Sequence, residues 1–490
     1  MPKFTFLWTD VFIYCLVAGM LLYSWRAART PSLRKAWGSV ARTASAMCAA
    51  MVLGAFLLIG LLDSIHYRPQ MPPAEGQEAG QAVYSPVVRS ALDDVLSWSR
   101  MGSPEATYSA PLALRQFTKE TQLIDGEAVR DYPRLKHAGL LLADDSEHAD
   151  DLRRRIAWGA AAALAIAALA ALLLTAGQLK GANGSLRPAW TAWWRSESGV
   201  PWRAMWITFA LMSLVVCVAW SLALDYHVLG TDRTGNDVLR QGLKGVRTAL
   251  VIGTLTTLAM LPPALFFGIS AGYFKGRVDD VIQYLYTTLT SIPGVLLIAA
   301  CVLMMQVYID TNPELFPTVA ARADLRLFLL CLILGLTGWA GLCRLLRAET
   351  LKLRELEYVQ AARAFGVSHW RIMTRHLLPN LMHIVLITMV LEFSGLVLYE
   401  AVLSYLGIGV DPATPSFGTM IDSSRMEMSR DPMIWWNLLA AFLFMLALVL
   451  SANIFADAVQ AAFDPRTRRF RPRLKRPEPD GAAGTQGASP

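Results

Sequence analysis

Apolar residues in this chain come in long blocks separated by polar segments, instead of alternating over short distances. Each block is near or above the roughly 20 residues that cross the hydrocarbon core of a bilayer. The blocks predict helices over residues 7–25, 44–62, 156–177, 204–224, 248–274, 281–309, 327–343, 381–406 and 433–456. The pattern therefore predicts an all-α polytopic membrane protein that crosses the bilayer many times.

Composition supports this class. Hydrophobic residues make up 54% of the 490 positions and charged residues only 17%, against about a quarter charged in soluble domains. The six cysteines lie in or beside the apolar blocks and form no CxxC pair, which favours a packing role over disulfides or zinc.

Basic residues predict the orientation of the spans. Lys and Arg gather in residues 26–42, 178–203 and 344–380 and in the tail 466–476, and helices at the predicted positions place all four segments on one side. Because short cytoplasmic loops are enriched in Lys and Arg, we expect this side to be the cytoplasm. The N-terminus then lies outside and the C-terminus inside, and the net charge of +7 reflects these loops and not a nucleic-acid partner.

The long polar stretch 63–155 is expected to be an extracytoplasmic loop or a small cap. Apolar spacing within residues 85–101 predicts one amphipathic helix there. Arg153, Arg154 and Arg155 then fall on the outer side, but loops longer than about 60 residues largely escape the charge rule. The tail after Pro477 is rich in Pro, Gly and Ala and is expected to be disordered.

Chemistry-bearing motifs point away from an enzyme. The chain has no GxxxxGK[ST] phosphate loop and no HExxH zinc motif, and its seven histidines are scattered, so we expect no metal site. Two carboxylates, Glu392 and Glu400, lie in the eighth predicted span, where an ionisable residue is a functional hypothesis by default. For Glu400 the alternative is a packing role at a helix end; for Glu392 the question stays open.

Prolines are expected to break two of the predicted spans. Pro262–Pro263 interrupt the fifth span, and residues 291–294, which include Pro293, interrupt the sixth. Broken helices in membranes face protein or a water-filled cavity and can mark a substrate route. A packing kink is an equally good interpretation of Pro262–Pro263.

The segment 351–380 is long for a loop between two spans and has a helical pattern. Residues 351–365 are good helix formers, and Gly366 fits the left-handed position after a helix. Ser368 can cap a second helix, which Pro379 stops or kinks. This pattern predicts a helix–turn–helix on the inner face, suited to docking another protein; a basic helix that binds lipid headgroups is the alternative.

This segment resembles the signature loop of bacterial ABC-importer permeases, written EAA-x3-G-x9-I-x-L-P. Ala361, Ala362, Gly366, Leu378 and Pro379 occupy its positions at the right spacing. Gln360 stands at the Glu and His376 at the Ile, and permeases of the oligopeptide/dipeptide class also lack that Glu. The resemblance implies that the segment docks an ATPase subunit through the following residues: Glu357, Gln360, Ala361, Ala362, Arg363, Gly366, His376, Leu378 and Pro379.

Three further stretches are similar to the second permease subunit of the peptide/nickel class. Residues 229–250 contain a G-T-D-x-x-G-x-D segment, in which Asn236 replaces the usual Arg. Residues 270–297 match a G-Y turn followed by S-x-P, and residues 399–421 match an E-x-x-L-S-x-L-G segment that ends in P-S-x-G. Four matches in the same order make the resemblance specific over residues 204–465.

The resemblance implies a six-helix type I ABC-importer permease core with about three extra N-terminal transmembrane helices. We expect two helices in residues 1–62, the outer loop in 63–155, a third helix and a cytoplasmic loop in 156–203, the core in 204–465 and a cytoplasmic tail in 466–490. Pro293, Glu392 and Glu400 are the candidate pathway residues. The chain itself would bind no cofactor.

Function and partners also follow from the resemblance. The chain would be a permease of the bacterial inner membrane for peptides or peptide-like solutes, working with a second permease subunit, two cytoplasmic ATPase subunits that bind ATP and Mg, and an extracytoplasmic solute-binding protein. A stand-alone secondary transporter or channel is the alternative, and an enzyme or signalling scaffold built on residues 63–155 lacks a catalytic constellation. The sequence does not set the solute, which could be a peptide, an antimicrobial peptide or nickel.

Overall fold

The computed structural model describes residues 3–71, 84–124, 127–139, 142, 145–178, 185–196, 199–312, 314 and 318–463. Within these residues, nine helical stretches are long and apolar enough to cross a membrane, and each overlaps one predicted span. The prediction of an all-α polytopic membrane protein is therefore confirmed. The predicted tail, residues 466–490, lies outside the described residues.

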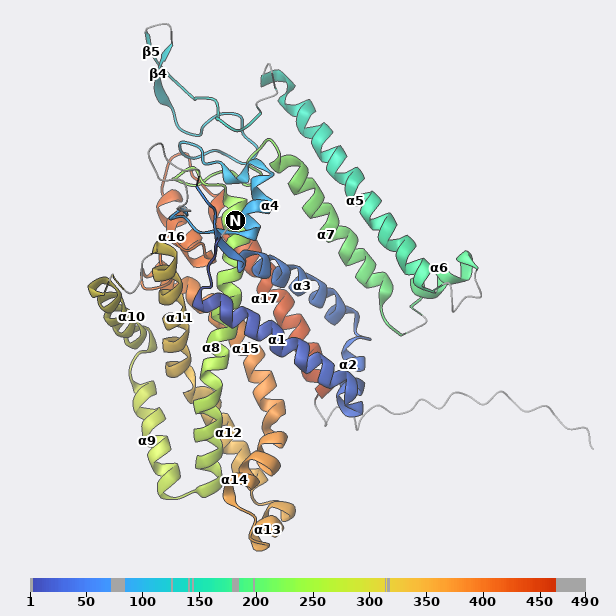
Figure 1. Cartoon of the computed structure of the whole chain (residues 1–490), viewed down its shortest axis with the longest axis vertical. Coiled ribbons are helices and arrows are strands. Elements are labelled where there is room, and N and C mark those ends of the chain that lie inside the picture. Colours follow the sequence, from blue (N-terminus) through green and yellow to red (C-terminus); the bar gives the residue numbers. More distant parts are fainter. Residues whose placement is uncertain are drawn as a thin grey trace, which may run out of the picture.

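A bundle of long helices forms the centre of the molecule (Figure 1). Its members are α8 (Val238–Phe274), α9 (Arg277–Ser291), α10 (Gly294–Thr311), α11 (Val319–Gly338), α12 (Ala340–Leu353), α15 (Leu378–Tyr405) and α17 (Trp436–Phe463). Glycines on α8 allow its neighbours to pack closely: a Cβ on Gly268 would lie 2.9 Å from the Cys343 carbonyl oxygen of α12. Such small-residue contacts are typical of helix packing in membranes, where no hydrophobic effect drives helices together.

The N-terminal helices lie against this bundle. α1 (Trp8–Arg29) and α3 (Ala44–Asp63) form a hairpin closed by the short α2 (Pro31–Val40), and α3 contacts α8 and α17. At the open end of the hairpin, β1 (Lys3–Phe4) pairs antiparallel with β2 (His66–Arg68), which pairs with β3 (Arg89–Ser90). The start of the chain and the residues that follow α3 therefore lie at the same end of the molecule.

A second hairpin leans away from the bundle (Figure 1). It consists of α5 (His148–Gln178) and α7 (Trp202–Ala223), with the short α6 (Leu186–Trp194) between them. Small residues recur every four positions on the buried stripe of α5, namely Gly159, Ala163, Ala167, Ala171 and Thr175. A Cβ on Gly159 would lie 2.7 Å from the Val218 Cα, so the backbones of α5 and α7 touch there.

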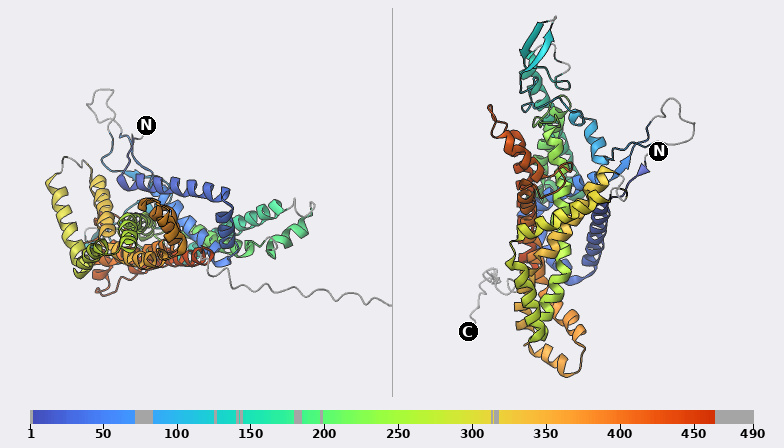
Figure 2. Two further views of the ribbon diagram at one scale, coloured as in Figure 1. Left: turned by 90° about the horizontal axis from the view of Figure 1, so that it is seen from below. Right: turned by 90° about the vertical axis from the view of Figure 1, so that its left-hand side faces the viewer.

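Residues 84–124 and 127–139, together called the cap, cover one end of the bundle. They contain α4 (Ala91–Ser97) and a hairpin of β4 (Glu120–Ile124) and β5 (Glu127–Asp131). The hairpin marks one extremity of the molecule, and α13 (Glu357–Ala364) and α14 (His369–Ile372) mark the other (Figure 2). α16 (Phe417–Glu427) lies near the cap end (Figure 1).

Several predicted boundaries need correction. The helix predicted within 85–101 begins only at Ala91, because residues 89–90 form β3. α5 begins at His148, eight residues earlier than predicted, because Asp151 pairs with Arg154 and Arg155, and Arg155 also pairs with Asp225. Arg153 pairs with Asp150, so each of the three arginines on the outer side has a carboxylate partner.

The two proline sites behave differently. The predicted break at residues 291–294 is confirmed, since α9 ends at Ser291 and α10 begins at Gly294. The predicted interruption at Pro262–Pro263 is wrong, because α8 continues through both prolines. Within a bundle, neighbouring helices can satisfy the carbonyls that proline leaves without a donor.

Candidate docking segment and translocation pathway

The predicted docking segment forms two short helices joined by a tight turn. The helix predicted over residues 351–365 is divided in the structure, because α12 ends at Leu353 and α13 begins at Glu357. After α13, Gly366 adopts φ +73°. The Gly366 N–H donates to the Arg363 carbonyl (3.1 Å), and the Val367 N–H donates to that of Ala362 (3.1 Å). This pair of bonds is a Schellman motif, so the predicted left-handed position of Gly366 is confirmed.

The second half of the segment differs from the prediction. Ser368 is the N-cap of α14, but its side chain makes no capping hydrogen bond. Pro379 does not end the helix: a π-helical turn over Met373–Leu377 follows α14 and leads directly into α15, where Pro379 is the second residue. Pro379 removes one N–H donor from this continuous helical path, and the helix runs through it as α8 runs through Pro262–Pro263. His376 and Leu378 are half-buried in this turn, and Pro379 is exposed.

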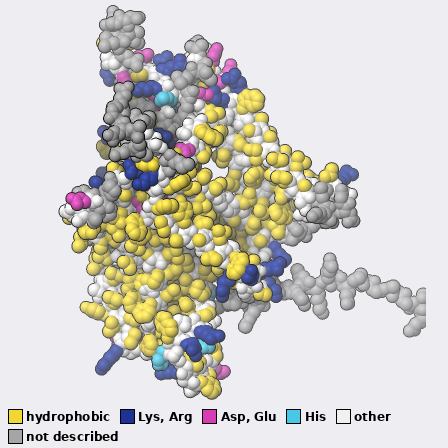
Figure 3. Space-filling view, in the orientation of Figure 1, with side chains coloured by type: hydrophobic (Ala, Val, Ile, Leu, Met, Phe, Trp, Pro, Cys, Tyr) yellow, Lys and Arg dark blue, Asp and Glu magenta, His cyan; other side chains and the backbone are white. Residues whose placement is uncertain are grey.

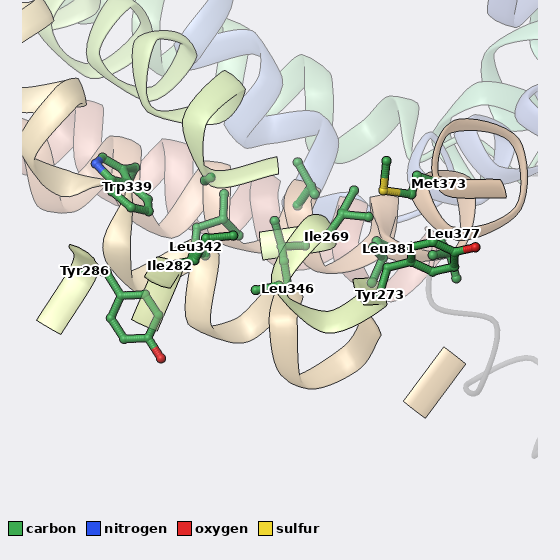
Figure 4. Packing of buried hydrophobic residues seen from close by; sticks show 14 of the residues in the cluster. Ile269, Tyr273, Ile282, Tyr286, Trp339, Leu342, Leu346, Met373, Leu377 and Leu381 are labelled. Atoms are coloured by element: carbon green, nitrogen blue, oxygen red, sulfur yellow. The ribbon is translucent and has the colours of Figure 1, made fainter. Parts of the chain in front are cut away.

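Buried side chains anchor the inner face of the segment. Val359, Ile372 and Leu377 are buried and join a cluster with residues of α8, α9, α12 and α15. Figure 4 shows part of this cluster, with Leu377 and Leu381 beside Tyr273 and Ile269. Helix α15 therefore continues from the segment through the bundle without a hinge loop.

Polar contacts tie the segment to the turn between α8 and α9. The Lys275 ammonium lies 3.0 Å from the Glu355 carboxylate, and the Arg354 guanidinium donates to the Tyr273 carbonyl (2.7 Å). The Tyr273 hydroxyl is 2.8 Å from His369 Nδ1. These contacts connect the segment to α8 and to the turn between α8 and α9.

The outer face of the segment carries exposed aromatic and basic side chains. Phe365 is 87% exposed and Trp370 is 63% exposed. The predicted docking residues Glu357, Gln360, Ala361, Arg363 and Gly366 are also exposed, whereas Ala362 is half-buried and packs against the cluster. Exposed large aromatics are rare on a solvated surface and are enriched at protein interfaces.

The three candidate pathway residues have different environments. Pro293 is exposed in the break between α9 and α10, where Gly294 lies near the Tyr399 hydroxyl. Glu400 is buried, and it accepts hydrogen bonds from the hydroxyls of Ser404 (2.7 Å) and Ser416 (3.0 Å). Since Ser416 is the N-cap of α16, Glu400 joins the end of α15 to the start of α16.

Glu392 lies deeper in α15 and is half-buried. The Glu400 geometry agrees with the packing role that the sequence left as an alternative. No residue in the described part of the chain forms a hydrogen bond or an ion pair with the Glu392 carboxylate. Of the two glutamates, Glu392 is therefore the one whose carboxylate makes no polar contact with the described residues.

A buried ionic cluster joins α1 to the bundle and was not foreseen. Arg247 Nη2 of α8 donates to Asp10 Oδ1 (2.6 Å) and to Thr9 Oγ1 (2.6 Å), and it lies 3.4 Å from Asp324 Oδ1 of α11. His66 Nδ1 lies 2.8 Å from the other Asp10 oxygen. A buried charge needs such partners, since its desolvation is costly. The only indication of this cluster in the sequence was one charged residue in or beside an apolar block in each of three distant segments, namely Asp10, Arg247 and Asp324.

The cap covers the G-T-D-x-x-G-x-D turn, which precedes α8. Thr231 Oγ1 accepts a hydrogen bond from the Ser109 N–H (2.7 Å) and donates to the Thr107 carbonyl (2.9 Å). The Glu105 N–H donates to the Gly235 carbonyl (2.9 Å). The N-terminal extension therefore contacts the core through one of the segments that carry the resemblance.

A buried histidine lies at this contact. His227 Nδ1 is 2.7 Å from Asp237 Oδ2, and His227 Nε2 is 3.6 Å from Glu105 Oε1. Burial lowers the pKa of His227, but the two carboxylates outweigh it and raise the pKa to about 9. Burial raises the pKa of the Glu105 carboxyl. His227 and two backbone N–H groups lower it by more, so the pKa lies below its usual value. The His227 ring therefore lies between a carboxylate of the cap, Glu105, and one of the core, Asp237.

One stretch of α8 fits the letters of a hydrolase motif without its structure. Residues 268–272 read GISAG, as in the G-x-S-x-G nucleophile elbow. The elbow requires a sharp turn between a strand and a helix, whereas Gly268 and Gly272 lie inside α8 and pack against α12. Close packing of α8 against α12 therefore explains both glycines.

The fold and the projecting two-helix segment define a membrane-spanning permease subunit. The family described as binding-protein-dependent transport system inner membrane component matches residues 264–469. An oligopeptide transport system permease protein OppC of Mycobacterium tuberculosis is 33% identical over 245 residues, covering 50% of this chain and 78% of that protein. The chain belongs to this family, within the oligopeptide/dipeptide class of ABC permeases.

Other relatives lie in the same class. A dipeptide transport system permease protein DppC of Lactococcus lactis is 28% identical over 242 residues, which are 49% of this chain and 64% of that protein. A peptidoglycan transport system permease protein YejE of Agrobacterium fabrum is 36% identical over 241 residues, 49% of this chain and 57% of that protein. The matches cover about half of this chain, in agreement with a permease core that carries an extension.

Proposed function

We propose that this chain is one transmembrane half of an ATP-driven importer for peptides or peptide-like solutes. It would pair with a second permease subunit, work with two cytoplasmic ATPase subunits that bind ATP and Mg, and receive solute from an extracytoplasmic binding protein. The observation that carries the proposal is the α13–α14 segment, which is anchored by buried side chains and presents Phe365 and Trp370 outward. Relatives whose names refer to peptide transport support the solute class.

The orientation follows from this role. The docking segment belongs in the cytoplasm of a bacterium, where ATP is available, so the opposite end of the bundle faces outward across the inner membrane. That end carries β1, the cap and the turn before α8, which supports an N-terminus on the outside. The solute-binding protein would approach from this cap-bearing side.

The geometry suggests how movement of an ATPase subunit reaches the solute pathway. When a partner displaces α13, the Glu355–Lys275 ion pair pulls on the turn between α8 and α9. The helical path from α14 to α15 carries the same movement toward Glu392. Helix α9 leads to the break at Pro293, where α10 can change its angle without breaking internal helix hydrogen bonds.

A double variant tests the docking assignment. Phe365→Ala/Trp370→Ala removes both exposed aromatics and should abolish uptake of labelled di- and oligopeptides and prevent co-purification of the ATPase subunits, because buried aromatics dominate interface energetics. Trp158→Ala is the control, since Trp158 is 69% exposed on α5, away from both the docking segment and the cap. Normal uptake and normal co-purification in the double variant would refute the assignment.

A further inference from the structure

A basic hollow lies at the elbow between α1 and α3. It encloses about 810 Å³ and is lined by residues from the end of α1, from α2 and from the turn before α3. Four cationic side chains line it: Arg29, Arg34, Lys35 and Arg42. Among the described residues no carboxylate lines the hollow, so its described lining carries a concentrated positive charge.

These four cations lack the partners that other clustered cations of the chain have. Arg154 and Arg155 pair with Asp151, and Arg240 and Lys244 pair with Asp93. Within the described part of the chain, none of the four lining cations forms an ion pair with an Asp or Glu. An unpaired cluster of like charges costs free energy by mutual repulsion, and an anionic ligand would remove that cost.

Aromatic side chains border the hollow on the α1 side. The Arg29 guanidinium carbon lies 3.8 Å from the centre of the Trp25 ring, and the Trp37 indole N–H donates to the Tyr23 hydroxyl (3.2 Å). Trp and Tyr are enriched where a membrane protein meets the headgroup region. The aromatic border therefore places the hollow at headgroup depth.

An apolar surface continues from this border along α1. Leu21 and Leu22 are each 67% exposed on the helix turn next to Trp25. Figure 3 shows Lys and Arg side chains gathered in the region of α2, directly beside hydrophobic surface. Ala36 and Val40 of α2 are buried, which fixes Arg34 and Lys35 on the outward face. A phosphate in the hollow and an acyl chain along α1 would satisfy both surfaces at once.

We propose that this hollow binds the phosphate-bearing headgroup of an anionic membrane lipid, with an acyl chain of the same lipid lying along α1. A free phosphate ion offers the same charge but would make no use of the exposed leucines. Basic pockets between membrane helices are suited to such headgroups, and each Lys or Arg near the surface adds to the attraction. The proposal concerns the N-terminal extension and does not depend on the transported solute.

Native mass spectrometry of the purified full-length chain in detergent tests the proposal, with phosphatidylglycerol as the probe and phosphatidylcholine as the neutral comparison. We expect preferential retention of phosphatidylglycerol by the unmodified chain. The variant Arg29→Gln/Arg34→Gln/Lys35→Gln/Arg42→Gln should lower the apparent affinity by at least about tenfold. Equal retention by this variant and by the unmodified chain would overturn the proposal.

Two control variants separate a site from a general charge effect. Arg187→Gln/Arg195→Gln/Arg203→Gln/Arg344→Gln removes the same charge from exposed positions outside the hollow and outside the docking segment, and it should leave retention unchanged; an equal loss would overturn the site. The charge-retaining variant Arg29→Lys/Arg34→Lys/Lys35→Arg/Arg42→Lys should bind, which shows that a chain altered at all four positions still folds, and its failure to bind would count against a charge-based site.

A soluble competitor separates a lipid from a free anion. Millimolar inorganic phosphate should displace little phosphatidylglycerol, because it lacks the acyl chain that contacts α1. Full displacement by inorganic phosphate at the same ionic strength as a chloride control would show a free-anion pocket and overturn the assignment to a lipid.

Discussion

Gly235, in the turn before α8, touches the backbone of Glu105 in the cap. A Cβ on Gly235 would overlap the Glu105 carbonyl oxygen, and Gly235 also adopts φ +76°. The motif turn of the core and the N-terminal extension therefore fit together only if this position lacks a side chain. In this chain the extension is built into the permease core and is not a separately attached domain.

The substitution Gly235→Ala should loosen the cap. The added methyl group collides with backbone and demands an unfavourable φ, so we expect a loss of about 1–3 kcal/mol and faster proteolysis within residues 84–139. Gly276→Ala is the control, since Gly276 has φ +57° but none of the described residues lies within 4 Å of the added methyl group. If limited proteolysis of the two variants proceeds at the same rate, the clash does not hold the cap in place.

The sequence predicted the membrane helices well because their signal is local. A block of apolar residues must cross the bilayer whatever surrounds it, and the break before Gly294 lies where Pro293 and Gly294 together disfavour a continuous helix. The turn at Gly366 was also local, because φ > 0 after a helix favours glycine. Errors arose where neighbours decide the outcome, as at Pro262–Pro263, which α8 accommodates inside the bundle.

The contacts of the extension could not be predicted, because they join residues that are far apart in the sequence. Asp10 and Arg247 are in contact although more than two hundred positions separate them, and no sequence motif links the two residues. The same holds for Glu105 and His227. Of the candidate site, the positions and the turn of the docking segment were predictable, but its exposed aromatics and its separation from α12 were not.

The Arg247 cluster should be essential for the stability of the N-terminal hairpin. Arg247→Met leaves Asp10 and Asp324 buried without their cation, and breaking a buried pair in this way typically costs about 3–5 kcal/mol. The melting temperature of the purified chain in detergent should fall strongly. Arg326→Met is the control, because Arg326 pairs with the more exposed Asp411; an equal fall in both variants would contradict a special role of Arg247.

The contact between cap and core should weaken in alkali. The pKa of His227 is raised from 6.5 to about 9 in the folded chain by Asp237 and Glu105, against the effect of burial. A raised pKa stabilises the fold fully below pH 6.5, and this contribution is lost as the pH rises through about 9. Melting temperatures measured between about pH 6 and 10 should therefore decline more for the unmodified chain than for His227→Gln. Parallel pH curves would show that His227 is not protonated in the folded state.

Gly159 should be required for the close pairing of α5 with α7. Gly159→Leu places a side chain where a Cβ alone would lie 2.7 Å from the Val218 Cα, and overpacking of this kind costs about 1–3 kcal/mol. Gly177→Leu, on the same helix with no described residue within 4 Å of its added Cβ, should be tolerated. Thermal unfolding in detergent compares the two, and equal stability would mean that the hairpin backbones are not in contact at Gly159.

The two glutamates of α15 should separate stability from transport. Glu400→Ala leaves the hydroxyls of Ser404 and Ser416 without their acceptor. Because a buried polar group without a partner costs about 1–3 kcal/mol, we expect a lower melting temperature. Glu392→Ala removes a carboxylate that has no polar partner among the described residues, so its melting temperature should change little.

Peptide uptake then decides the role of Glu392. If its carboxylate lines the solute route, Glu392→Ala impairs uptake in a chain that remains fully stable. Glu392→Gln should then restore only the part of the uptake that depends on side-chain shape and hydrogen bonding, and not the part that needs the negative charge. Glu400→Ala should lose uptake only in proportion to the folded protein that remains. The opposite pattern, a stable but inactive Glu400→Ala and an active Glu392→Ala, would move the pathway to the junction of α15 and α16.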